Sequence, residues 1–407
     1  MQPESVRRFA DPTTAPHVMT LVMMSAMSAM AMNMFLPSLP SMTAYFQTEY
    51  RLMQLSVALF LGVNAVLQVV IGPISDRYGR RPVLLAGFVI FLASTIGCLY
   101  ATTAEMFLAF RMGQATIVVS MVLSRAIIRD LYDQDQAASM LGYVTMGMAV
   151  VPMLTPAIGG YLDEHFGWHA NFWVFLAAGS AVTFLIWLDC GETNHQKSQS
   201  FAAQLRDWPE LLMSPRFWGY ALAAAFSSGA FFAYLGGAPF VGSEVFDLSP
   251  THLGLLFGAP AIGYIAGNGI TGRVARRHGI DRMILIGATI AWAGVTLSLI
   301  LFKLGYGTAI SFFGLMIFVG LGNGLTLPSA NVGAMSVRPE LAGSASGLSG
   351  ALTVGAGAIV TSLTGWLLTE DNGAWALVAI LLVTALIGLT AAILTRRLEF
   401  ALAAQDV

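Results

Sequence analysis

Long apolar stretches alternate with short polar segments along the whole chain. A membrane-spanning helix needs roughly 20 apolar residues, and eleven stretches of 20 or more residues contain no Asp, Glu, Lys or Arg. They are residues 12–48, 52–75, 82–104, 136–162, 165–188, 217–243, 248–272, 283–302, 304–337, 341–369 and 372–395. A twelfth stretch, from Glu105 to Arg125, is interrupted only by Arg111. Because a helix satisfies its own backbone groups in lipid, the pattern predicts an all-α membrane protein with twelve transmembrane helices.

The composition excludes several other classes of protein. Only 10% of the residues are charged and 56% are hydrophobic, whereas a soluble domain carries about 25% charged residues. The net charge of −2 offers no basic surface for nucleic acid. With two cysteines and no cluster of histidines or paired carboxylates, we expect no disulfide framework, no metal site, no cofactor and no catalytic residue, so the chain is not an enzyme.

The positions of lysine and arginine predict the orientation in the membrane. If the N-terminus is cytoplasmic, 17 of the 20 cations fall on the cytoplasmic side, Arg51 and Lys303 fall outside, and Arg111 lies within the membrane. Cytoplasmic loops carry an excess of such residues. We therefore expect both termini in the cytoplasm.

One long polar segment, residues 189–216, divides the chain. We interpret it as a cytoplasmic linker between two pseudo-symmetric six-helix bundles, residues 1–188 and 217–407. The halves repeat weakly at an offset near 200, which matches Gly72, Arg77 and Gly79 with Gly272, Arg277 and Gly279. Duplication of a six-helix unit is typical of a two-lobed transporter.

The sharpest local motif is GPISDRYGRRP, residues 72–82. Its glycines and proline permit a tight turn between the second and third helices. The motif resembles the loop 2–3 motif of the major facilitator superfamily. This resemblance implies the fold of that superfamily and a conformational clamp between the second helix and the start of the eleventh helix near Leu341. The residues that match the clamp motif are Gly72, Asp76, Arg77, Gly79, Arg80 and Arg81.

The predicted fifth helix contains Pro152, Pro156, Gly159 and Gly160. Prolines remove backbone donors from a helix, and small residues allow close contact between membrane helices, so ordinary packing accounts for this composition. The pattern also resembles the antiporter motif of exporters in the same superfamily, which favours export.

Arg111 is the only charge deep in a predicted span, where it costs about 2.5–3.5 kcal/mol on insertion scales. A structural role with backbone partners is the alternative to a functional one. The run from Arg111 to Ala115, which includes Gln114, resembles the RxxQG motif linked to proton transfer, with Ala115 in place of the glycine. A rise of about 1.5 Å per residue brings Asn33 to a similar depth, so we expect one polar cluster there.

A central cleft for substrate and protons is expected to contain further polar and aromatic side chains. Helix-to-helix hydrogen bonds and lipid packing are alternatives for the buried amides and aromatic rings. The residues expected in the cleft are Asn33, Arg111, Gln114, Tyr234, Asn64 and Tyr264.

Segments spread over the chain, among them residues 33–40 and 125–132, resemble the bicyclomycin, chloramphenicol and florfenicol resistance branch of drug:proton antiporters. The resemblance implies a monomeric exporter in the lipid of the bacterial inner membrane, which moves small amphipathic compounds by alternating access in exchange for protons. An exporter or facilitator of a metabolite, such as an amino acid or sugar, and a receptor without transport are the alternatives.

Asn33 stands where that branch usually has an aspartate that takes the proton. Asparagine does not titrate, and none of the 22 acidic residues falls mid-membrane. Three explanations stay open: weak or absent coupling, a proton relay through a rim group such as Glu105, or an engineered replacement of aspartate.

Overall fold

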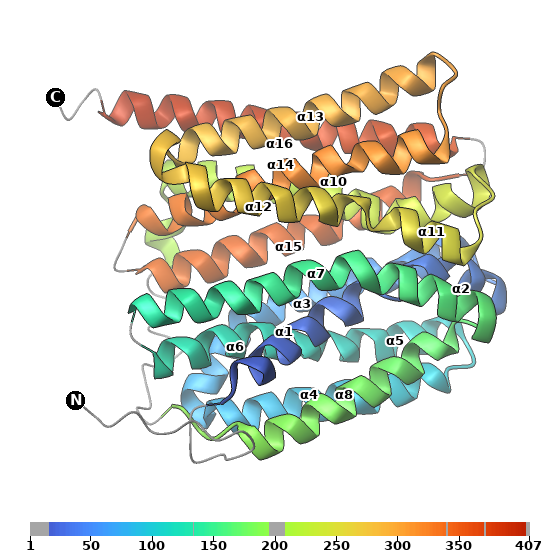
Figure 1. The fold of residues 1–407 in the computed structure, drawn as a ribbon, viewed down its shortest axis with the longest axis horizontal. Coiled ribbons are helices and arrows are strands. Elements are labelled where there is room, and N and C mark those ends of the chain that lie inside the picture. Colours follow the sequence, from blue (N-terminus) through green and yellow to red (C-terminus); the bar gives the residue numbers. More distant parts are fainter. Residues whose placement is uncertain (1–15, 133, 195–207, 339–340, 370–371, 404–407) are drawn as a thin grey trace.

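The computed structural model describes residues 16–132, 134–194, 208–338, 341–369 and 372–403, and every regular element within these ranges is a helix. Figure 1 shows the N-terminal half, in blue to green, beside the C-terminal half, in yellow to red, with the long helices of both halves running in one common direction. The predicted all-α class is confirmed. Both chain ends and residues 195–207 of the expected linker lie outside the described ranges.

The N-terminal half is built from long helices and short helical turns. Its elements are α1 (Val18–Asn33), η1 (Leu36–Ser38), α2 (Leu39–Tyr45), α3 (Tyr50–Tyr78), α4 (Arg80–Leu99), α5 (Ala104–Gln114), η2 (Ala115–Ile117), α6 (Val118–Leu131), α7 (Gln134–Phe166) and α8 (His169–Asp189).

The C-terminal half has a similar order of elements. They are α10 (Pro215–Phe240), the π-helical turn η3 (Val241–Val245), α11 (Pro250–Phe257), α12 (Ala259–His278), α13 (Ile280–Lys303), α14 (Ala309–Ser336), α15 (Ala342–Leu367) and α16 (Gly373–Ala403).

Eleven helical segments in the described ranges are long and apolar enough to cross a membrane. The remaining long helix, α7, has 33 residues and corresponds to the predicted span 136–162. Large apolar side chains such as Val66, Ile359 and Trp366 are mostly exposed on the surface. On membrane-crossing helices this surface faces lipid chains rather than water.

The motif of residues 72–82 is not the loop that the sequence predicts. Helix α3 continues through Pro73 to Tyr78, and only Gly79, at φ +100°, forms the turn into α4. Pro73 cannot donate to the carbonyl one turn earlier, but membrane helices tolerate this loss, and Pro73 does not end α3. The internal repeat is visible here, because Gly279 ends α12 at φ +81° in the same way.

The two halves pack tightly at the end where α2 and α11 lie, which we term the closed end. A Cβ added to Gly160 would collide with the carbonyl oxygen of Pro250, and one added to Gly254 would collide with that of Pro156. These close backbone contacts hold α7 of one half against α11 of the other. They explain why small residues stand at these positions.

The opposite end of the molecule is open between the halves. Among the described residues, no atom of another element lies within 4 Å of a Cβ built on Gly72 of α3, or on Gly343 and Gly347 of α15. We term this region the open end. Near the closed end, Gln54 in the first turns of α3 donates to the Thr361 carbonyl of α15 over 2.8 Å. The halves therefore meet at one end and diverge at the other.

Replacing Gly160 by Val should separate α7 from α11, because the added side chain meets backbone that has no room to move. Overpacking costs about 1–3 kcal/mol, which shifts a two-state population by about 5- to 150-fold. Spin labels on Phe166→Cys and His252→Cys, at the closed end of opposite halves, measure the effect as a longer label-to-label distance. Gly269→Val is the matched control, because open space surrounds Gly269. Equal distances in both variants would contradict the role of Gly160.

Candidate functional site

A cavity of about 280 Å³ lies between the two halves. Three of the residues expected in the cleft, Asn33 of α1, Asn64 of α3 and Tyr264 of α12, line it, and so does Pro152 of α7. Phe231 and further residues of α10, α14 and α15 complete the wall. Both halves therefore contribute to one site, and it is of a size that suits a small molecule.

Four amide side chains stand in the otherwise mostly apolar wall of the cavity. In α3, Gln68 donates to the Oδ1 atom of Asn64 over 2.6 Å, and in α1 the Asn33 amide donates to the Ala29 carbonyl over 2.8 Å. On the other side, Asn323 of α14 accepts a hydrogen bond from Ser227 of α10 over 2.8 Å. The residues that line the cavity include no Asp, Glu, Lys, Arg or His. The site offers hydrogen bonds and apolar surface, but no charge.

Arg111 does not line this cavity. It is 1% exposed, and its guanidinium donates to the Ala31 carbonyl over 2.8 Å and to Gln114 over 2.6 Å. The rings of Phe35 and Phe60 each lie 4.2 Å from its Cζ atom. These contacts combine carbonyl, amide and cation–π partners, and they tie α5 to α1 and α3.

Two other expected cleft residues also lie in the protein interior. Gln114 donates its amide to Thr95 over 2.8 Å, which joins α5 to α4. The Tyr234 hydroxyl donates to the Phe257 carbonyl over 2.9 Å, and its ring stacks on the ring of Phe257. The expected approach of α1 and α5 is present at Ala31, but Asn33 and Arg111 have separate partners.

Both glycines of the predicted antiporter motif, Gly159 and Gly160, make close contacts at the closed end. A Cβ on Gly159 would strike the Met34 carbonyl of α1, whereas Gly160 faces α11 across the interface. Glu164, one turn further along α7, accepts a hydrogen bond from the backbone N–H of Thr251 over 3.0 Å. A carboxylate is favourable at the N-terminus of a helix such as α11. Gly160 and Glu164 thus hold the closed end together.

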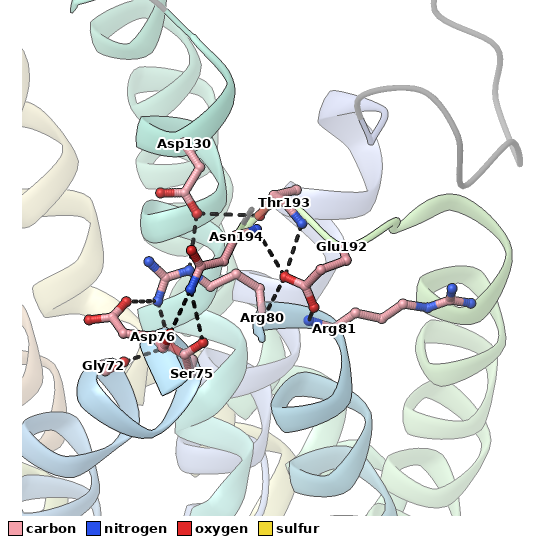
Figure 2. Close-up of polar contacts among 9 residues, drawn as sticks. All are labelled: Gly72, Ser75, Asp76, Arg80, Arg81, Asp130, Glu192, Thr193 and Asn194. Atoms are coloured by element: carbon pink, nitrogen blue, oxygen red, sulfur yellow. Dashed lines mark hydrogen bonds and ion pairs between the residues drawn. The ribbon is translucent and has the colours of Figure 1, made fainter. Parts of the chain in front are cut away.

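Figure 2 shows the charged cluster at the open end, which involves the residues of the predicted clamp. Arg80 pairs with Asp76 over 2.5 Å and with Asp130 of α6 over 3.0 Å. Asp76 makes no hydrogen bond or ion pair with α15 within the part of the chain that the structure describes. Arg77 lies over the ring of Tyr78, and Arg81 donates to the Trp187 carbonyl. In this conformation the cluster joins helices of the N-terminal half only.

Glu192, which the sequence did not identify, completes the cluster in Figure 2. Its carboxylate accepts from the backbone N–H groups of Arg80 over 2.8 Å and Arg81 over 3.2 Å. These are unpaired donors of the first turn of α4, and Gly79 before them has no side chain to cap the helix. Asn194 extends the contact by donating to the Asp76 carbonyl over 2.9 Å.

The sequence offered only an indirect signal for this cap. Gly79, the residue before α4, has no side chain that could accept from the first N–H groups of the helix. The position of the capping group in the sequence was not predictable.

In the described ranges, no group of three or more His, Cys, Asp or Glu residues is placed to hold a metal ion. Burial raises the pKa of the neighbouring Cys190 thiol to about 12, so this thiol stays protonated at neutral pH.

Comparisons with known proteins agree on one family of relatives. The family described as Major Facilitator Superfamily matches residues 21–362. The chain is 32% identical over 378 residues to an uncharacterized MFS-type transporter, YdgK, of Bacillus subtilis, covering 90% of this chain and 92% of that protein. It is 29% identical over 388 residues to a chloramphenicol resistance protein of Pseudomonas aeruginosa, with 92% and 90% covered. Identity is 26% over 351 residues to a bicyclomycin resistance protein homolog of Haemophilus influenzae, with 85% and 88% covered.

Among solved structures, a bacterial homologue of the human lysosomal transporter Spinster, in an inward-facing and occupied conformation, superposes with a TM-score of 0.74 at 16% identity. The alignment covers 93% of this chain and 96% of that chain, which shows a common fold. The predicted resemblance to the drug-resistance branch is confirmed by the relatives at sequence level. The chain belongs to the major facilitator superfamily and is a multi-pass membrane transporter, not an enzyme.

Proposed function

We propose that this protein exports small amphipathic compounds across the bacterial inner membrane by alternating access. The observation that carries the proposal is the central cavity, because both halves line it and it lies between a closed end and an open end. Relatives named for resistance to chloramphenicol and bicyclomycin support a drug-like cargo. Transport requires one chain only, since a single chain builds the whole cavity, so the functional unit is a monomer in lipid.

The charge distribution supports a cytoplasmic position for the open end. The helix ends there carry Arg77, Arg80 and Arg81 in the N-terminal half and Arg277 and Arg282 in the C-terminal half. Such an excess of cations is typical of cytoplasmic loops. The structure is then inward-facing, and both termini and the linker 189–216 are cytoplasmic.

The outward-facing state requires the reverse arrangement. The Gly160 and Glu164 contacts at the closed end separate, and the ends of α3 and α15 come together at the open end. Asp76 and the start of α15 then lie close enough for the clamp that the family motif implies. The empty space beside Gly72 and Gly343 is the room into which this movement proceeds.

Export is coupled to protons in this proposal, and Asp163 is the group that carries the proton. It is 7% exposed in α7 at the closed end, where Ser41 of α2 donates a hydrogen bond to its carboxylate. Asp163 directly precedes Glu164, whose contact with Thr251 is lost in the outward-facing state, so this movement changes the surroundings of Asp163. Glu105, the rim acid that the sequence suggested for a proton relay, is exposed already. Since no carboxylate lines the cavity, an uncoupled facilitator is the second candidate.

Purified protein in liposomes tests the coupling. On addition of chloramphenicol, a pH-sensitive dye inside the vesicles should record proton movement opposite to the drug. Asp163→Asn should abolish the proton signal, because an amide does not titrate, while chloramphenicol still equilibrates. Glu105→Gln is the matched control and should retain the signal. Drug movement without any proton signal in the unaltered protein would reject antiport and support the facilitator.

Asp76→Asn should slow export by disfavouring the outward-facing state, because it removes the charge that the clamp with the start of α15 requires, whereas Arg80 keeps Asp130 as a partner in the present state. The expected decrease in initial export rate is at least tenfold, roughly 1.4 kcal/mol. Asp130→Asn is the matched control, since it removes the other carboxylate of Arg80 and leaves the end of α3 intact.

Labelling of introduced cysteines at the open end measures the conformation directly, because Cys98 and Cys190 are both buried. Asp76→Asn should increase labelling there relative to Asp130→Asn. Equal rates and equal labelling in the two variants would rule out a specific clamp at Asp76.

A further inference from the structure

One amide side chain crosses from the N-terminal half into the C-terminal half near the closed end. Gln54 of α3 is 1% exposed, and its amide donates to the Thr361 carbonyl of α15 over 2.8 Å. One turn earlier in α3, the Tyr50 hydroxyl donates to the Gly236 carbonyl of α10 over 2.9 Å. One end of α3 thus makes hydrogen bonds to two helices of the other half.

Two glycines of the C-terminal half make room for the Gln54 side chain. A Cβ on Gly365 of α15 would overlap the side-chain oxygen of Gln54, and a Cβ on Gly236 of α10 would overlap its side-chain nitrogen. Any larger residue at either position would occupy the space that the amide fills. Gln54 therefore lies in a slot between α10 and α15, which we term the amide slot.

The amide slot belongs to a pair of helices that are joined to each other. The Thr361 hydroxyl donates to the Phe232 carbonyl of α10 over 3.0 Å, and a Cβ on Gly357 of α15 would overlap the Phe232 ring. These contacts hold α10 and α15 together beside the slot. The carbonyl that Gln54 binds is therefore in a fixed position within the C-terminal half.

The rest of the contact between α3 and α15 has a different character. Gly355 of α15 faces Ala65 of α3 at an ordinary contact distance, 3.8 Å from an added Cβ. Nearer the open end, Gln68 donates to Asn64 of its own helix. Among the described residues, Gln54 makes the only hydrogen bond between α3 and α15. The two helices are thus joined by a polar contact at the closed end alone.

Gln54 also lies between the cavity and the outer surface. It is on the same face of α3 as Leu61 and Gln68, since seven residues are close to two helical turns, and both of these residues line the cavity. A rise of about 1.5 Å per residue puts Gln54 about 10 Å beyond Leu61 toward the closed end. Separation of the halves at that end therefore requires Gln54 to leave the amide slot.

The chemistry of an amide suits a contact that forms and separates. Gln54 supplies a hydrogen-bond donor without a charge, and burial of a neutral polar group that has a partner costs far less than burial of a charged one. When the slot opens to the outer solution, water replaces the lost partner on both sides. A lysine or arginine in the same place would be much more costly to bury again.

We propose that Gln54 is the latch of the closed end. Its amide occupies the slot between Gly236 and Gly365 in the inward-facing state and leaves it when the closed end opens. Gln54 is a positioning residue, because it sets the balance between the two states without contacting the cargo. This inference rests on the alternating access of the proposed function and names a residue that controls it.

Distances between spin labels on Phe166→Cys and His252→Cys, measured in the full chain in lipid, test the latch. Gly365→Ala should displace Gln54 from the slot and increase the population with separated labels by about 5- to 150-fold, the range expected for overpacking. Gly355→Ala is the matched control on α15. It should leave the label distances unchanged, because its added methyl group makes only an ordinary contact.

A second substitution distinguishes a latch from simple crowding. Gln54→Ala alone should increase the separated population by about 3- to 10-fold, the equivalent of one hydrogen bond. Combined with Gly365→Ala, the same substitution should decrease the separated population, because the short side chain no longer competes with the added methyl group. A general loss of stability does not produce opposite effects of one substitution in two backgrounds.

The outcomes separate the latch from the proposed function. If Gln54→Ala has the same effect in both backgrounds, or no effect in either, the latch is wrong; chloramphenicol transport by the unaltered protein in liposomes then still supports export. If the effects are opposite but chloramphenicol is not transported, the latch stands and the proposed cargo is wrong. Gly236→Ala, which meets the nitrogen of the same amide, provides the comparison if Gly365→Ala does not fold.

Discussion

The lack of water in the hydrocarbon core controls this structure, because every polar group at that depth needs a partner from the protein. Arg111 shows how the chain meets most of this requirement for a charge, since Nε is the only guanidinium nitrogen without a hydrogen-bond partner among the described residues. A carbonyl, an amide and two aromatic faces surround the guanidinium, and these partners come from α1, α3 and α5. The same contacts join three helices of the N-terminal half. The charge therefore needs partners from these helices and at the same time holds them together.

In the proposed transport cycle the interface between the halves needs a different property, because it has to form and separate. At the closed end the contact depends on backbone surfaces that meet at glycines and on a few hydrogen bonds between the halves, from Thr251 to Glu164, from Tyr50 to the Gly236 carbonyl and from Gln54 to the Thr361 carbonyl. Close packing of small residues gives many weak contacts that depend on shape. Such contacts are lost together when the surfaces separate and leave no buried charge unpaired, which suits an interface that opens repeatedly.

The charged cluster at the open end is held within one half. Asp76, Arg80, Asp130 and Glu192 connect α3, α4, α6 and the segment after α8, so these elements move as one body. The cavity wall, by contrast, contains amides and hydroxyls without charge. Charges therefore lie at the ends and inside the halves, and neutral hydrogen-bonding groups line the cavity. In the proposed transport cycle, this separation lets the halves move without exposing a charge to the cavity.

The sequence by itself determined the membrane class, the helical spans and the family, because these depend on composition, stretch length and local motifs. It also singled out Asn33, Asn64 and Tyr264, which line the cavity in the structure. Tertiary structure alone decided that Arg111, Gln114 and Tyr234 point into helix contacts. In an apolar helix, hydrophobic periodicity does not show whether an inward-facing residue packs against a neighbouring helix or lines a cavity. The cap of α4 by Glu192 also required the fold, because 112 residues separate Glu192 from Arg80.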